Sequence, residues 1–336
     1  MAFVTEIPPL QFKKPVFCSI LGNTRLSTVP GISGAGPTPE KTLFTPALDA
    51  ELIVHGSITS MPAKPNTPTG CPTPATITRA MMELTGISPL FINAGLAHNP
   101  TVPCLDVYGG VGADPREQDA IPCAEALYQC GIWIGKFLSG LGDLLVLGEC
   151  VPGGTTTALC VLRALGYSAS VSSSFVKNPL SKKEEVSRIV IDRIRSAGIT
   201  DPLNIIRATG DPMMPVACGI ARSYSGNLIL AGGTQMLSVA GLVRAMGGRV
   251  PLIATTSFVR DDPSANVIQL SEEIGVKMVY VDPGFEDLGH SGLARYCIGE
   301  VKEGMGAGGA MLLAYLMGHS PVEIREKIYE TVSVYS

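Results

Sequence analysis

The sequence of 336 residues has little charge and no long apolar run. Charged residues make up 16% of it and the net charge is −4, with no basic tract, so nucleic acid is not expected as a partner. No stretch approaches the roughly 18 uncharged apolar residues of a membrane span, and Lys13 and Lys14 interrupt the N-terminal region. We therefore expect neither membrane association nor a signal peptide, and a cytoplasmic location.

Several common site motifs are also missing. The nine cysteines include no C-x-x-C pair, so no metal site is predicted and reduced thiols are the default. There is no Walker G-x-x-x-x-G-K-[ST] motif, and no G-x-G-x-x-G motif follows the first predicted strand. These absences count against P-loop enzymes and dinucleotide-dependent dehydrogenases. We expect the protein to work without a metal or a redox cofactor.

The residues that are plentiful indicate a large folded core. Apolar residues make up 46% of the chain, and 38 glycines and 26 prolines fit many tight turns rather than disorder. The length exceeds the usual limit for a single core, which is about 250–300 residues. We predict a large nucleotide-binding unit at residues 85–315, and a smaller accessory unit formed by residues 1–84 with 316–336. The boundary follows a loop at residues 60–74 that contains five prolines.

Apolar segments typical of strands alternate with helical segments. Strands are predicted at 15–21, 89–94, 103–108, 144–148, 227–231, 250–255 and 276–281, with helices between most of them. Ser181 with Glu184, and Ser320 with Glu323, have the spacing of capping boxes at the start of two helices. The alternation predicts an α/β fold: a mostly parallel, Rossmann-like sheet of about six strands with helices on both faces. Ligands of such sheets bind at the carboxyl ends of the strands.

The stretch 144–159 joins a predicted strand, a glycine turn and a predicted helix. Four apolar residues lead to Glu149, and Gly153-Gly154 precede Thr155 and Thr156. Glycines let backbone N–H groups approach a phosphate, and the dipole of the following helix favours negative charge. A carboxylate beside a phosphate suits a ligand with phosphate at one end and developing positive charge at the other. A nucleotide ribose that reacts at its anomeric carbon is such a ligand.

Two further glycine-rich turns are candidates, one after the predicted strand 227–231 and one before an apolar helix near the C-terminus. Gly232, Gly233 and Thr234 are a second candidate for phosphate or ribose contacts, with an ordinary tight turn as an equally weighted alternative. Glu303 opens a glycine-rich segment beside an apolar helix, where partial desolvation would raise its pKa toward neutrality. An exposed loop glutamate, or one that caps the next helix, is the alternative for Glu303.

Ordinary structural roles are also open for other polar residues near these turns. Glu149 could be a strand-end acid paired with Arg163 or Lys177, and Asp211 could be a helix N-cap and no more. His98 and His290 are assigned structural rather than catalytic roles.

The two glutamate-containing segments resemble motifs of one family. The pattern Gly148-Glu149-x-x-x-Gly153-x-Thr155-Thr156 resembles the G-E-M-G-I-G-N-T-T motif of nicotinate-nucleotide–dimethylbenzimidazole phosphoribosyltransferases, which act in the cobalamin nucleotide-loop pathway. Glu303-Gly304-x-Gly306-Ala307 resembles their E-G-[TS]-G-A motif, and Glu286 with Gly289-His290 resembles their E-x-x-G-H element. The resemblance covers roughly residues 85–315. The segment 31–37 resembles an archaeal and cyanobacterial branch of proteins related to these enzymes.

The resemblance implies a pentosyltransferase. The phosphoribosyl group of nicotinate mononucleotide would move onto an aromatic base, such as dimethylbenzimidazole or adenine, in cobamide assembly. Glu303 would be the general base, Glu149 would face the ribose or the reacting centre, and Val301 would line the base pocket. The implied phosphate and ribose contacts are Gly153, Gly154, Thr155, Thr156, Gly232, Gly233, Thr234, Gly304 and Gly306. A homodimer is implied as well.

The chain departs from the family pattern at several of these positions. Val151-Pro152 replaces Gly-Ile, Gly154 replaces Asn, and Lys302 stands where the family has Gly before its glutamate. A catalytically altered nucleotide-binding paralogue is therefore the main alternative. A Rossmann-type oxidoreductase is a weaker one, because its fingerprint is missing. Assays with several bases, and calorimetry with a dinucleotide, distinguish these alternatives.

Overall fold

Seven strands form one sheet at the centre of the computed structural model, which describes residues 2–335. All six pairings between neighbouring strands are parallel, in the order β3-β2-β1-β4-β5-β6-β7. The strands are β1 (Pro15–Gly22), β2 (Leu90–Gly95), β3 (Leu105–Asp106), β4 (Leu144–Cys150), β5 (Asn227–Ala231), β6 (Leu252–Thr256) and β7 (Met278–Val281). The predicted α/β fold is confirmed. Each strand lies at one of the seven predicted strand segments, and the sheet has seven strands where about six were predicted.

The strand order reverses between β1 and β4. From β1 the chain adds β2 and β3 on one side, and it then returns to β4 and adds β5, β6 and β7 on the other side. β1 and β4 pair directly, with Val16 opposite Leu145. A point where parallel strands diverge in this way leaves a crevice at their carboxyl ends, where ligands of open α/β sheets bind. Glu149 lies at that end of β4.

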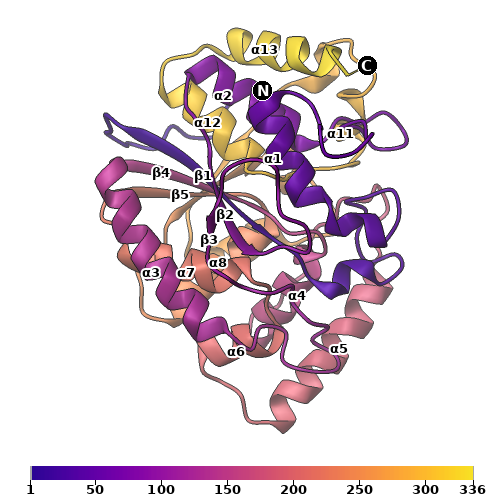
Figure 1. Ribbon diagram of the computed structural model, residues 1–336, viewed down its shortest axis with the longest axis vertical. Helices are drawn as coiled ribbons and strands as arrows, with labels where there is room; N and C mark the ends of the chain where they lie inside the picture. Colours follow the sequence, from indigo (N-terminus) through magenta and orange to yellow (C-terminus); the bar gives the residue numbers. More distant parts are fainter. Residues whose placement is uncertain (1, 336) are drawn as a thin grey trace.

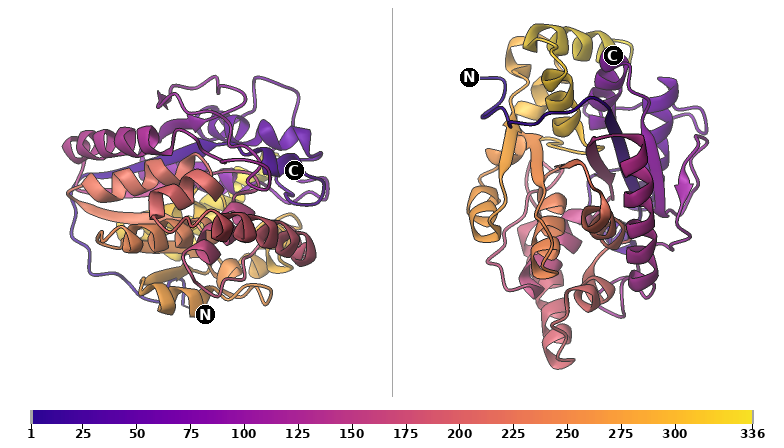
Figure 2. Two further views of the ribbon diagram at one scale, coloured as in Figure 1. Left: turned by 90° about the horizontal axis from the view of Figure 1, so that it is seen from below. Right: turned by 90° about the vertical axis from the view of Figure 1, so that its left-hand side faces the viewer.

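Helices cover both faces of the sheet (Figures 1 and 2). Since successive strand residues point to opposite faces, Leu145 and Leu147 enter one core and Leu144 and Val146 enter the other. The first core is covered by α3 (Ala124–Leu141), α4 (Gly154–Ala164), α7 (Met213–Ser223), α8 (Thr234–Ala245) and α10 (Val267–Ile274). The second is covered by α1 (Thr45–His55), α2 (Pro74–Thr85), α12 (Ala307–Leu316) and α13 (Pro321–Ser333).

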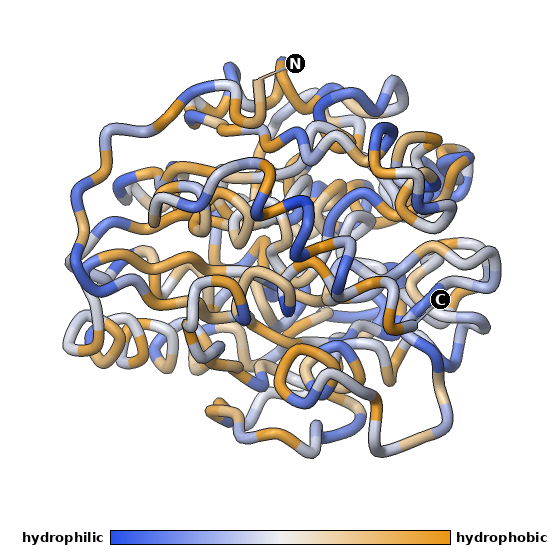
Figure 3. The backbone as a smooth tube through the Cα atoms, turned by 90° about the horizontal axis from the view of Figure 1, so that it is seen from above, coloured by the Kyte–Doolittle hydropathy of each residue, from blue (hydrophilic) through white to orange (hydrophobic). Residues whose placement is uncertain are grey.

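The other helices lie outside these two layers or are short. They are α5 (Leu180–Ser196), α6 (Pro202–Thr209), α9 (Ser257–Arg260) and α11 (Ala294–Cys297), with 3-10 helices η1 (Arg25–Thr28), η2 (Glu40–Leu43) and η3 (Phe285–Asp287). Hydrophobic segments run through the middle of the molecule, and many hydrophilic residues lie at its periphery (Figure 3). Within residues 2–335, no helix has the length and apolar character needed to cross a membrane.

One of the two predicted capping boxes is present. The Ser320 hydroxyl accepts from the backbone of Glu323, and the Glu323 carboxylate accepts from the Ser320 backbone, at the start of α13. The predicted box of Ser181 and Glu184 is wrong, because α5 begins before it, at Leu180. The Glu184 carboxylate instead accepts a 2.7 Å hydrogen bond from Arg163 Nη1 of α4, so its side chain is used between helices.

Glycines in α12 let this helix approach the sheet closely. A Cβ at Gly309 would lie 2.3 Å from Ala231 Cβ of β5, and a Cβ at Gly308 would lie 2.5 Å from the backbone of Thr255 in β6. The loop that precedes α12 is bound to the end of β4 by a 3.0 Å hydrogen bond from Met305 N to the Glu149 carbonyl oxygen. The glycine-rich segment therefore brings Glu303 to the carboxyl ends of the central strands.

The division into residues 85–315, and 1–84 with 316–336, stays a prediction. β1 lies in the middle of the sheet of the larger part. By contrast, α2 packs against α1, α12 and α13, so that the two ends of the chain meet on one face of the sheet. Figures 1 and 2 show this group of helices at the end of the molecule where both termini lie.

Candidate active site

A cavity of about 870 Å³ lies at the carboxyl ends of the central strands. This volume is within the usual range of small-molecule sites. The turns after β4 and β5 contribute small polar residues to its wall: Gly153, Gly154, Thr155, Gly233 and Thr234. α1 and the loops on either side of it contribute mostly apolar ones, including Phe44, Leu48, Ile58, Met61 and Pro62. The cavity therefore has a polar side and an apolar side.

Two helix N-termini meet on the polar side. Gly153 precedes α4 in the left-handed conformation (φ 81°), and Gly233 precedes α8. Within residues 2–335, the backbone N–H groups of Gly153, Thr155, Gly233 and Thr234 have no hydrogen-bond acceptor in the protein. Unpaired N–H groups and helix dipoles that converge on one space form an anion site.

A buried lysine lies behind the first of these turns. Lys183 of α5 is 1% exposed, and its Nζ is 3.2 Å from Thr155 Oγ1 and 2.6 Å from the Ser172 carbonyl oxygen. Burial lowers the pKa of Lys183 to about 7, against the opposing effect of Asp262. An anion bound at Thr155 would favour the charged form of this lysine.

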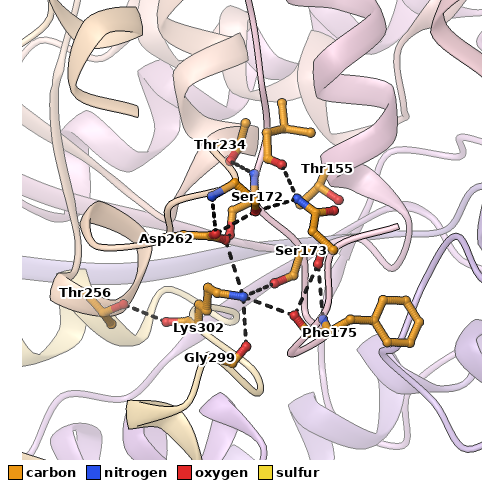
Figure 4. A network of polar contacts seen from close by, with 12 residues as sticks. Thr155, Ser172, Ser173, Phe175, Thr234, Thr256, Asp262, Gly299 and Lys302 are labelled. Atoms are coloured by element: carbon orange, nitrogen blue, oxygen red, sulfur yellow. Dashed lines mark hydrogen bonds and ion pairs between the residues drawn. The ribbon is translucent and has the colours of Figure 1, made fainter. Parts of the chain in front are cut away.

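Lys302 and Asp262 extend this contact to the loop that carries Glu303 (Figure 4). Lys302 Nζ is 3.4 Å from Asp262 Oδ2 and donates to the carbonyl oxygens of Ser173, Phe175 and Gly299. Asp262 Oδ2 also accepts from Ser172 Oγ at 2.6 Å. The network joins the segment 172–175 of the cavity wall to the residues before Glu303.

The carboxylate of Glu303 is surrounded by hydrogen-bond donors from the end of β6, from its own loop and from α12. It accepts from Thr255 Oγ1 at 3.1 Å, from the backbone N–H of Thr256 at 3.2 Å, and from the N–H groups of Gly304 and Gly308. Burial raises the pKa of Glu303 to about 7, and these hydrogen bonds oppose the rise. A carboxylate with this pKa can take a proton at neutral pH. Glu303 is thus not an exposed loop glutamate, but it does cap the next helix, because it accepts from the N–H of Gly308 in the first turn of α12.

Glu149 is the second carboxyl group in the cavity wall. Its Oε2 accepts from Gln235 Nε2 at 2.5 Å and from the Val151 N–H at 3.1 Å. Burial, followed by the negative charges of Asp211 and Glu303, raises the pKa of Glu149 to about 8. Close acids of this kind titrate together, so Glu149 and Glu303 resist ionising at the same time.

The ordinary ion pair considered for Glu149 is absent. Arg163 pairs with Glu184, and Lys177 is exposed without an acidic partner within residues 2–335. Asp211 is not the N-cap of α7, which is Pro212, but its carboxylate accepts from the Met213 N–H at the start of this helix. It also accepts from Thr157 Oγ1 at 2.7 Å and is fully buried, and burial raises its pKa to about 6.

Sequence relatives identify the family. A UPF0284 protein of Methanosarcina mazei is 44% identical over 338 residues, covering 97% of this chain and 95% of the relative. A UPF0284 protein of Thermococcus gammatolerans is 43% identical, covering 94% of this chain and 96% of the relative. The chain belongs to the UPF0284 family. No model of a protein family matches the sequence.

Solved structures show what fold this UPF0284 protein shares. A nicotinate-nucleotide-dimethylbenzimidazole phosphoribosyltransferase from Thermus thermophilus matches with a TM-score of 0.62 and 15% identity, covering 96% of this chain and 83% of that chain. A structure of CobT from the same organism matches with a TM-score of 0.65 and 15% identity, covering 96% and 84%. The resemblance predicted from the motifs is thus confirmed at the level of the fold.

Most of the predicted site residues of this UPF0284 protein line the cavity. They are Glu149, Gly153, Gly154, Thr155, Gly233, Thr234, Val301, Glu303 and Gly304. Three do not line it, and for two of them, both glycines, the structure shows a packing role. A Cβ at Gly306 would lie 3.1 Å from Gly148 Cα, and a Cβ at Gly232 would lie 2.9 Å from Met236 Cγ. Thr156 is buried within the first turn of α4.

Sequence reasoning missed three side chains that shape the site. Asp49 lines the cavity from α1, Lys183 approaches Thr155 from α5, and Gln235 holds Glu149 from α8. Only Gln235 had a local signal, since it directly follows the second glycine turn. The assigned structural roles of the histidines agree with His98, which stacks on Phe44, and His290 Nδ1, which accepts from the Leu293 N–H. His290 also lines the cavity.

Proposed function

We propose that this protein transfers the phosphoribosyl group of nicotinate mononucleotide to a ring nitrogen of an aromatic base, in assembly of the nucleotide loop of a cobamide. The observation that carries the proposal is the presence of Glu149 and Glu303, two enclosed carboxyl groups with pKa values near neutrality, in the same cavity as two helix N-termini. The shared fold with a phosphoribosyltransferase supports it.

The polar side of the cavity binds the 5′-phosphate in this proposal. The unpaired N–H groups of Gly153, Thr155, Gly233 and Thr234 face a dianion, and Lys183 supplies a positive charge behind Thr155. Glu149 then faces the ribose. At neutral pH its raised pKa leaves it largely protonated, so it can donate to a ribose hydroxyl while Gln235 and Val151 hold it in place.

The reaction exchanges one N-glycosidic bond for another. Glu303 takes the N–H proton of the incoming base, and the freed electron pair of that nitrogen forms a bond to ribose C1′. The bond from C1′ to the nicotinate nitrogen breaks, its electrons return to the pyridine ring, and nicotinate leaves. Until it takes that proton, the carboxylate of Glu303 also places a negative charge near the ribose, where positive charge develops. The base lies between Val301 and the apolar side of the cavity.

The proposal is tested by incubating the purified protein with nicotinate mononucleotide and a panel of bases that includes dimethylbenzimidazole and adenine. Chromatography with mass spectrometry detects nicotinate and the base ribotide. Glu303→Gln should lower kcat by about 10²–10⁴-fold and leave the affinity for the nucleotide near that of the wild type. The matched control is Glu272→Gln, at an exposed position of α10.

The pH dependence separates loss of a base from general damage. Because Glu303 acts as a carboxylate, kcat/KM of the wild type should fall as the pH drops through about 7. This acid limb should be missing in Glu303→Gln. Equal rates and equal pH profiles for the two proteins would show that Glu303 is not the base.

A catalytically altered nucleotide-binding paralogue is the second candidate. Lys302 favours it, because this residue replaces the glycine of the phosphoribosyltransferase motif and its ammonium group is bound by Asp262 and three carbonyl oxygens. Binding of nicotinate mononucleotide by calorimetry, with no ribotide formed from any base, would identify this case. A third proposal, that the protein is a homodimer, is tested by light scattering of the purified chain.

A further inference from the structure

Asp49 is a carboxyl group on the apolar side of the cavity. It lies on α1, directly after the cavity residue Leu48, and five residues after Phe44, which also lines the cavity. The side chain is 8% exposed. It accepts from Thr73 Oγ1 at 3.0 Å through Oδ1 and from Cys150 Sγ at 3.7 Å through Oδ2.

The two contacts bind Asp49 to the chain segments beside the two proposed catalytic carboxyl groups. Cys150 directly follows Glu149 in β4. Thr73 precedes Pro74, and a Cβ at Gly304 would lie 3.3 Å from Pro74 Cγ. Asp49 is thus bound to the residue that follows Glu149, and to the residue that precedes Pro74, which lies beside Gly304. A base bound for attack on the ribose occupies this region of the cavity.

Asp49 has more hydrogen-bonding capacity than its two protein donors use. A carboxylate offers about four acceptor positions, and each oxygen of Asp49 receives one hydrogen bond. Burial raises the pKa of Asp49 to about 7, and the hydrogen bonds from Thr73 and Cys150 oppose this rise only in part. A methyl-substituted ring edge placed against this group would leave its remaining positions unpaired, which is unfavourable. An edge with an N–H donor would pair with it.

We propose that Asp49 determines which base is accepted, by receiving a hydrogen bond from an amino group on the edge of an aminopurine such as adenine. The inference rests on the proposed function, because it assumes that an aromatic base enters this cavity. It predicts that adenine is preferred over dimethylbenzimidazole, and also over hypoxanthine, which carries a carbonyl oxygen in place of the amino group.

The test measures dissociation constants for the three bases by calorimetry, with the protein alone so that no turnover occurs. Asp49→Asn keeps the size of the side chain and an acceptor for Thr73, but presents an amide NH₂ to the ligand. It should weaken adenine binding by about 10- to 100-fold and strengthen or preserve hypoxanthine binding. Asp49→Ala should lose the preference for adenine without any gain for hypoxanthine.

Thr73→Val is the matched control. It removes the hydrogen bond to Asp49 and leaves the carboxyl group in place, so the ratio of adenine to hypoxanthine affinities should change by less than about 3-fold. If Asp49 only supported the start of α2, Thr73→Val would reproduce the effect of Asp49→Asn. That result would overturn the proposal.

Other outcomes distinguish failure of the role proposed for Asp49 from failure of the proposed transferase function. Failure of the wild type to bind any base, an equal loss of all bases in Asp49→Asn, or a loss confined to nicotinate mononucleotide would each overturn the role of Asp49. Selective loss of adenine binding in Asp49→Asn would support that role. If the wild type then formed no ribotide, only the transferase proposal would fail.

Discussion

Gln235 Nε2 donates a hydrogen bond of 2.5 Å to Glu149 Oε2. The bond joins the first turn of α8 to the carboxyl group at the end of β4, so the turns after two neighbouring strands form one continuous wall. The same bond explains why position 154 is glycine, because a Cβ there would lie 2.4 Å from Gln235 Nε2. Glycine at position 154 therefore leaves room for Gln235 to bind Glu149, whether or not a ligand occupies the cavity.

Gly153 provides a test of the phosphate-binding turn. Gly153 (φ 81°) and Gly166 (φ 94°) flank α4, and both have left-handed backbones that disfavour an L side chain. Alanine at either position should lower the free energy of unfolding by about 1–3 kcal/mol. Only Gly153→Ala should also weaken binding of nicotinate mononucleotide, because Gly153 lines the cavity. Gly166 does not line it, and a Cβ at Gly166 would have no neighbour within 4 Å.

The measurements are urea unfolding for stability and calorimetry for nucleotide affinity, with both variants. Similar affinities for Gly153→Ala and Gly166→Ala would contradict the assignment of this turn.

Local patterns were enough to predict the sheet and one of the two catalytic candidates, Glu149. The runs 144–148 and 227–231 form strands and lack an alternation of polar and apolar residues. This is the pattern expected of strands in a sheet that is covered on both faces. The carboxyl ends of parallel strands lie at one edge, so Glu149 and the turn at Gly233 could be placed together from chain order alone. Glu303 required the motif resemblance, because the strand-turn-helix pattern is incomplete there.

Contacts between distant segments could not be predicted in this way. Lys183 and Thr155 are 28 positions apart, and Asp49 and Cys150 are 101 positions apart. No periodicity within α1 or α5 marks these two residues as cavity residues, because that depends on how each helix packs. The same applies to Glu184, whose spacing from Ser181 fits a capping box but whose side chain reaches Arg163 across a helix interface.

Lys183 should contribute to phosphate affinity through its charge. Removing the ammonium group in Lys183→Met leaves Thr155 Oγ1 without its buried cationic neighbour. Affinity for nicotinate mononucleotide should fall by about 10-fold, as expected for loss of one nearby positive charge at a partly buried site. The adjacent Lys182 is exposed and donates to the Pro30 carbonyl oxygen, so Lys182→Met is a matched control with the same change in net charge.

Calorimetry with nicotinate mononucleotide and with inorganic phosphate distinguishes the roles. Equal effects of Lys183→Met and Lys182→Met on both ligands would place the phosphate elsewhere in the cavity.

The buried acids should also make stability depend on pH. Burial raises the folded-state pKa of Asp49, Glu149, Asp211 and Glu303 to between about 6 and about 8, above unfolded values of about 4. Between these limits the folded state binds more protons than the unfolded state, so the free energy of unfolding should fall as the pH rises from about 5 to about 7.

Removal of one such acid should reduce this dependence. Acids whose folded-state pKa is lowered, such as Glu184 and Glu300, change the stability only below this pH range. Their stabilising effect is lost only as the pH drops below the pKa that they have in the unfolded chain. Over pH 5–7, Glu149→Gln should therefore make the decline shallower by about 1.4 kcal/mol per pH unit, the effect of one proton. Exposed Glu272→Gln should not change it. Urea unfolding of the three proteins at pH 5, 6 and 7 measures these slopes, and identical slopes for the wild type and Glu149→Gln would mean that Glu149 titrates in the folded protein as it does in the unfolded chain.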